Sequence, residues 1–185
     1  MDDRLVAARI VLMIAAVIAE ALGTLLHLST EECLPRLEPL PRNRAAGVVL
    51  GYIALVMCVP HAEVVAPDFL VPFLWPIALI APWVCAFYVD NPTARAVGGL
   101  MILFAYEVVH RTFECRFYGA PVLAVAAWGF GIAGIWLSGY PVSMRDALRL
   151  AARRRWFRHA ASGIFWGLAL LFTVAAVVGR GGTAR

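Results

Sequence analysis

Long apolar stretches divide the chain, and short polar or proline-bearing segments separate them. A membrane-crossing helix needs roughly 17–25 mostly apolar residues. Stretches of this length are predicted at about 5–28, 45–66, 68–89, 95–113, 121–140 and 160–179. The pattern therefore predicts an all-α, polytopic membrane protein: one transmembrane helical domain, residues 1–185, with about six transmembrane helices.

The composition supports the same conclusion. Hydrophobic residues make up 62% of the 185 residues and charged residues only 15%. Soluble domains are about 45–50% apolar and about 25% charged, so this excess of apolar residues has to be buried in lipid. The lipid bilayer is thus the expected partner. No base-stacking array or recognition motif accompanies the net charge of +4, and we expect no nucleic-acid binding.

The basic residues indicate how the chain is oriented. All sixteen are arginine, which we interpret as the coding bias of a GC-rich genome. Short cytoplasmic loops retain positive charge. With the N-terminus outside, the inner loops hold ten arginines: Arg36, Arg42, Arg44, Arg95, Arg145, Arg149, Arg153, Arg154, Arg155 and Arg158. We therefore expect a multi-pass protein of a bacterial inner membrane.

The segment 143–159 differs from the predicted spans. Met144, Ala147, Leu148 and Ala151 share one helical face, and arginines fill the other. This arrangement is typical of an amphipathic helix lying on an anionic leaflet. We expect an interfacial helix there.

Ionisable residues inside membrane spans are costly, so each is a functional candidate. Glu20 lies deep in the first predicted helix, and His27 follows seven residues later on the same face. The pair could relay a proton or contact a ligand. Alternatively, Glu20 could be a neutral acid hydrogen-bonded to a neighbouring helix.

Glu107, His110 and Arg111 form a second polar group at the end of the fourth predicted helix. Glu-x-x-His occurs here once, whereas di-iron bundles need two copies and two further glutamates, so no metal site is predicted. A b-type haem needs two facing imidazoles, and only His27 with His159, or His61 with His110, would share a side. We do not expect haem.

Small residues mark the helix faces expected to pack. Gly163 and Gly167 form a GxxxG pair in the last predicted helix, and Gly129, Gly131 and Gly134 lie in the fifth. Such residues let helix backbones approach closely in lipid. Gly163 and Gly167 are the predicted contact for a membrane protein partner or for a homo-oligomer.

One stretch carries a family resemblance. The sequence from Tyr106 through His110-Arg111-Thr112-Phe113 to Pro121 resembles a segment of the steroid 5α-reductase family, and enoyl-CoA and polyprenol reductases are similar. The resemblance implies NADPH-dependent reduction of a carbon–carbon double bond beside a carbonyl, in a lipophilic substrate held among the helices. It further implies that Tyr106 and Glu107 lie near the substrate in catalytic roles. Arg111 and His110 would then contact the cofactor.

Other positions depart from the family pattern. Leu74 stands where the family has glutamate, Val108 stands where it has tyrosine, and 174–178 lack its asparagine and aspartate. The family's C-terminal cofactor-binding part has no counterpart. Two interpretations therefore stay open: a reductase-like protein, degenerate or completed by a partner, and a non-catalytic membrane subunit, scaffold or small transporter.

Overall fold

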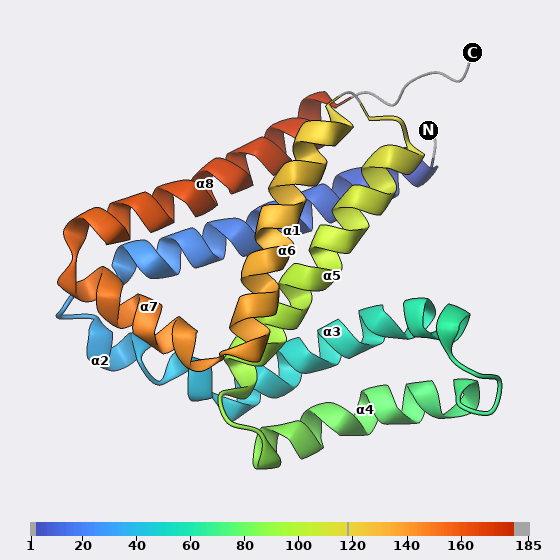
Figure 1. Ribbon diagram of the computed structural model, residues 1–185, viewed down its shortest axis with the longest axis horizontal. Coiled ribbons are helices and arrows are strands. Elements are labelled where there is room, and N and C mark those ends of the chain that lie inside the picture. The colour runs from blue at the N-terminus through green and yellow to red at the C-terminus, as the bar shows by residue number, and fades with distance from the viewer. Residues whose placement is uncertain (1–2, 118, 180–185) are drawn as a thin grey trace.

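The computed structural model of the protein describes residues 3–117 and 119–179. Within these ranges the chain forms eight α-helices and one 3₁₀ helix (Figure 1). In chain order they are α1 (Asp3–Leu28), α2 (Leu34–Leu37), η1 (Leu40–Arg42), α3 (Arg44–Val65), α4 (Val71–Tyr88), α5 (Pro92–Glu114), α6 (Ala120–Gly139), α7 (Val142–Arg153) and α8 (Arg155–Val178).

Six of these helices are long and apolar enough to cross a membrane: α1, α3, α4, α5, α6 and α8. They coincide with the six predicted stretches, and the all-α polytopic prediction is confirmed. Residues at the helix N-termini explain where two helices begin. At the start of α3 the Asn43 side chain accepts a hydrogen bond from the Ala46 amide. At the start of α5 stands Pro92, whose missing N–H would have had no partner within the helix.

The helices form pairs. α1 packs along α8, α5 packs along α6, and α3 lies between α5 and α4 (Figure 1). Two glycines determine how closely α5 and α6 approach: a Cβ atom added to Gly98 would lie 2.6 Å from the Gly134 carbonyl oxygen, and one added to Gly134 would lie 2.7 Å from the Gly98 carbonyl oxygen. Gly134 was one of the residues predicted to pack. Apolar side chains from α1, α5, α6 and α8 fill the core, with Phe130 and Phe172 in edge-to-face contact.

The predicted interfacial helix is shorter than expected. α7 ends at Arg153, and Arg154 adopts an extended conformation (φ −120°, ψ 103°) before α8 begins. The predicted segment 143–159 therefore contains a break: Arg155, Arg158 and His159 lie in the first turns of a spanning helix. The break is required because α7 lies across the end of the bundle, whereas α8 runs along it (Figure 1). Leu148 and Ala151 on the predicted apolar face are buried, as expected.

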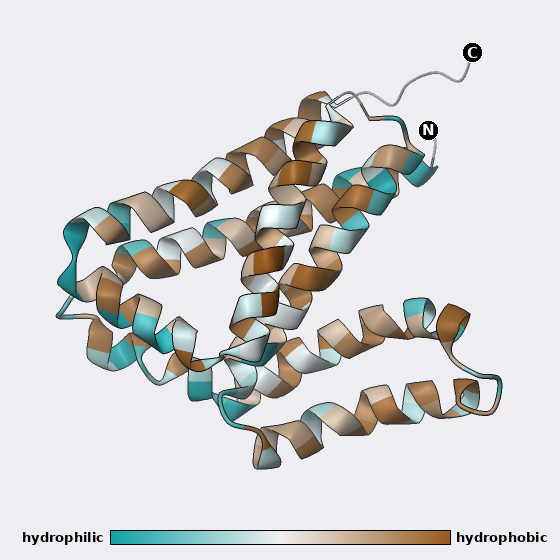
Figure 2. Ribbon diagram, in the orientation of Figure 1, coloured by the Kyte–Doolittle hydropathy of each residue, from teal (hydrophilic) through white to brown (hydrophobic). Residues whose placement is uncertain are grey.

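Hydrophilic residues gather at the end of the bundle that carries α2, η1 and α7 (Figure 2). Polar contacts connect the segments there: Thr93 Oγ1 donates to the Asn43 carbonyl oxygen at 2.6 Å, and Arg95 donates to the Ser138 carbonyl oxygen at 2.9 Å. Arg149 also pairs with Glu38. The arginines assigned to the inner loops therefore share one end of the bundle, which we name the arginine-rich end.

Candidate functional site

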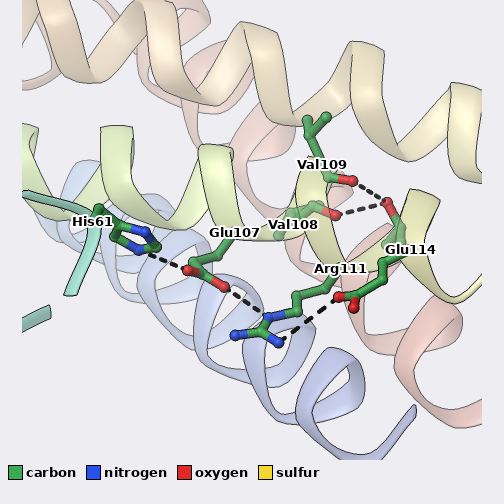
Figure 3. A network of polar contacts seen from close by, with 7 residues as sticks. His61, Glu107, Val108, Val109, Arg111 and Glu114 are labelled. Atoms are coloured by element: carbon green, nitrogen blue, oxygen red, sulfur yellow. Dashed lines mark hydrogen bonds and ion pairs between the residues drawn. The ribbon is translucent and has the colours of Figure 1, made fainter. Parts of the chain in front are cut away.

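A cluster of polar side chains surrounds Glu107 near the other end of the bundle (Figure 3). Glu107 lies on α5 seven residues before the last helical residue, which is about 10 Å along the axis. Its carboxylate is buried, with 8% of the side chain exposed. One oxygen lies 2.9 Å from Nε2 of His61 on α3, and the other accepts a hydrogen bond from Arg111 Nε at 3.0 Å.

The cluster extends toward the helix end through alternating charges. Arg111 lies 3.9 Å from a carboxylate oxygen of Glu114, and Arg4 of α1 lies 3.3 Å from the other oxygen of Glu114. Glu107, Arg111 and Glu114 occupy one face of α5 because helix positions three and four residues apart are neighbours. Two acids and two arginines balance in charge.

Aromatic rings line its edge. The Tyr106 ring contacts the His61 ring edge-on at 5.1 Å between centroids and stacks on the His110 ring at 5.7 Å. The structure thus brings together all four residues that the sequence proposed on this helix: Tyr106, Glu107, His110 and Arg111. Tyr106 and His110 are exposed, whereas Glu107 is buried. Their catalytic and cofactor-binding roles stay predictions.

This arrangement has two chemical capabilities. A buried carboxylate between an imidazole and a guanidinium can exchange a proton with the imidazole, and it can also fix α3 against α5. Sequence reasoning did not assign Glu114 or Arg4 to this site. The spacing of Glu107, Arg111 and Glu114 on one face of α5 was a usable signal for Glu114, whereas the contributions of Arg4 and His61 depend on helix packing.

The other predicted polar pair is not brought together. Glu20 is exposed on α1 and has no polar partner within residues 3–117 and 119–179. Within these ranges Glu20 makes no hydrogen bond to a neighbouring helix, and its role stays a prediction. His27 lies against other rings: its centroid is 5.7 Å from that of His159 and 5.0 Å from that of Trp166.

The GxxxG residues of α8 do not pack within the bundle. Gly163 and Gly167 are exposed, and a Cβ atom added to either would meet no atom within 4 Å. The backbone contacts predicted from small residues occur instead at Gly98 and Gly134. Contact of Gly163 and Gly167 with a partner stays a prediction.

An apolar pocket of about 500 Å³ is lined by residues of α1, α5, α6, α7 and α8. Its lining is apolar except for the Trp136 indole nitrogen and the Ser143 hydroxyl. The lining residues are Leu22, Leu25, Leu26, Met101, Gly129, Ile132, Ala133, Trp136, Leu137, Ser143, Met144, Ala147, Leu148 and Phe165. The sequence did not predict a ligand site at these residues, because apolar side chains of these types also occur at lipid-facing and core positions of any membrane helix.

Comparison with known proteins gives no functional assignment. Neither the protein-family models, nor the curated proteins, nor the solved structures include a match to this chain. Among residues 3–117 and 119–179, no group of three or more His, Cys, Asp or Glu side chains could hold a metal ion. The function must therefore be argued from the pocket and the polar side chains themselves.

Proposed function

We propose that this membrane protein binds one lipophilic molecule from the bilayer in the apolar pocket. The observation that carries the proposal is the pocket's size and lining. Pockets that hold small ligands measure about 300–1,000 Å³ and are mostly apolar with a few placed polar groups. The volume of about 500 Å³ lies in this range, with Trp136 and Ser143 as the polar groups.

The depth of the pocket fits a molecule that enters from one leaflet. Its lining runs from α7 at the arginine-rich end to Gly129, ten residues before the end of α6. At 1.5 Å per residue this span is about 15 Å, which is half of a hydrocarbon core of about 30 Å. The polar groups Ser143 and Trp136 lie toward the α7 end. The ligand would therefore direct its polar end to α7 and its hydrocarbon toward the middle of the membrane.

The pocket is open to the surface of the bundle, so a molecule from the bilayer can enter and fill it. Because lipid is as apolar as the lining, selectivity would come from packing and from the two polar groups rather than from hydrophobicity.

The test uses two glycines that both have open space. Gly129 lines the pocket and Gly99 does not, and a Cβ atom at either position would meet nothing within 4 Å. We expect the parent protein and Gly99→Phe to retain a lipophile in native mass spectrometry after release from lipid nanodiscs. Gly129→Phe should lose it. Equal retention by the two variants would overturn the proposal.

The reductase interpretation makes a different prediction. It places NADPH contacts at Arg111 and His110, yet the Arg111 guanidinium already faces Glu107 and Glu114. A cofactor phosphate would have to replace these carboxylates. If the reductase interpretation is right, NADPH raises the melting temperature of the parent protein and Arg111→Ala abolishes the effect. An unchanged melting temperature in the parent would remove this interpretation.

A further inference from the structure

A second pocket, of about 430 Å³, lies at the arginine-rich end and contains three arginines. We call it the arginine pocket. Its lining residues are Arg42, Arg44, Val89, Asp90, Asn91, Pro92, Val142 and Arg145. Three arginines against one aspartate leave a net formal charge of +2. A concave surface with this charge favours an anion.

Carboxylates neutralise the three guanidinium groups only in part within the described ranges. Within the described ranges the Arg42 side chain has no hydrogen-bond or ion-pair partner. Arg44 lies over the Phe87 ring, with Cζ 5.8 Å from the ring centroid, and within the described ranges its side chain has no hydrogen-bond or ion-pair partner. The Nε atom of Arg145 is buried without an acceptor, and its nearest carboxylate oxygen, on Asp146, is 3.9 Å away.

Three helix N-termini meet at the same place. The lining residues Arg44, Pro92 and Val142 are the first residues of α3, α5 and α7. Each N-terminus carries a partial positive charge that favours anions, above all phosphate. At α3 the Asn43 side chain already accepts from the Ala46 amide. The starts of α5 and α7 have no side-chain cap. Val89 at the C-terminal end of α4 also lines the pocket, and a helix C-terminus carries a partial negative charge. Three helix N-termini therefore face one C-terminus, and the sum of their partial charges favours an anion.

The walls of the pocket are held in place by contacts between the helices. Thr93 near the start of α5 donates a hydrogen bond to the Asn43 carbonyl oxygen before α3. Gly47 packs so closely on Pro92 that an added Cβ atom would lie 2.7 Å from the proline ring. The backbone positions that carry Arg44 and the start of α5 are therefore held in place before a ligand arrives, which reduces the entropy lost on binding.

We propose that the arginine pocket binds a phosphate group through Arg42, Arg44 and Arg145. Guanidinium groups bind phosphate oxygens through paired, charge-assisted hydrogen bonds, and phosphate matches a charge of +2 better than a carboxylate does. The phosphate could belong to a phospholipid headgroup or to a soluble molecule, because the pocket lies beside the interfacial helix α7. This proposal does not rest on occupancy of the apolar pocket.

The experiment measures phosphate-dependent stability of the full chain. In neutral detergent, inorganic phosphate should raise the melting temperature of the parent above its value in chloride at equal ionic strength. Arg145→Gln and Arg42→Gln should each raise the half-saturating phosphate concentration at least tenfold. Arg36→Gln is the matched control, because Arg36 is exposed at the same end but outside the pocket.

A second arm identifies the source of the phosphate. The phosphorus content of the delipidated protein is measured after extraction from nanodiscs of zwitterionic lipid, with or without phosphatidic acid. Retained phosphatidic acid in the parent and in Arg36→Gln, but not in the two pocket variants, assigns the site to a lipid headgroup. Protection by inorganic phosphate without retained lipid assigns it to a soluble phosphate. The proposal is overturned if neither probe affects the parent, or if Arg36→Gln behaves like the pocket variants.

Discussion

The contact between Glu107 and its two donors should contribute measurably to stability, and Glu107→Gln tests it. The amide keeps the shape of the carboxylate but replaces one acceptor oxygen with a donor. His61 Nε2 and Arg111 Nε lie 2.9 and 3.0 Å from the two oxygens. In the variant the amide oxygen can accept from only one of them, and the amide N–H group faces the other. His61 Nε2 accepts that N–H group only when Nε2 carries no proton. One charge-assisted hydrogen bond is lost, and the charge of Arg111 loses its nearest partner.

The structure sets the size of the effect. A hydrogen bond to a charged group contributes about 1.5–3 kcal/mol, whereas hydrogen bonds between membrane helices average about 0.6 kcal/mol. Glu107 is buried, which favours the larger figure, but the His61 and Arg111 side chains are 36% and 35% exposed, which reduces it. We expect a loss of about 2 kcal/mol in the free energy of unfolding, a roughly 30-fold change in the equilibrium constant.

Reversible unfolding in mixed detergent and SDS micelles, followed by tryptophan fluorescence, measures this loss. Glu63→Gln is the control, because Glu63 is an exposed acid on α3 without a polar partner in the described part of the chain. It should change the free energy by less than about 0.5 kcal/mol. In a His61→Phe background, Glu107→Gln should cost less than in the parent, since the two residues are in contact. An equal cost in both backgrounds, or no cost in the parent, would refute the reasoning.

Three further predictions follow from the same structure. Gly98→Ala should destabilise the bundle by about 1–3 kcal/mol, because its Cβ meets the α6 backbone, whereas Gly163→Ala should not destabilise it; SDS unfolding compares the two. Glu20→Leu should leave the protein folded and at least as stable in nanodiscs, because Glu20 is exposed without a partner in the described ranges; unfolding on substitution would contradict this. With the other cysteines replaced by alanine, an impermeant maleimide should label Asp68→Cys in intact cells and Cys33 only after permeabilisation. The reverse pattern would invert the expected orientation.

Sequence alone determined the number and approximate limits of the spanning helices, because the hydropathy of a window depends only on its own residues. It also placed Glu107, His110 and Arg111 on one helix, since contacts three or four residues apart follow from helix geometry. The length of α7 was overestimated because the change of direction at Arg154 carries no hydropathy signal: the arginines continue into α8.

Only the tertiary structure decided which faces of the helices meet. Most faces of the spanning helices are apolar, and lipid provides no hydrophobic drive between the helices, so the sequence pattern does not show which face of a helix turns inward. The contact of His61 with Glu107, the outward position of Glu20 and the formation of the apolar pocket all depend on that rotation. The arginine pocket depends most on this packing. Its arginines lie up to about a hundred residues apart in the sequence, and only the packing of α3, α5 and α7 brings them together.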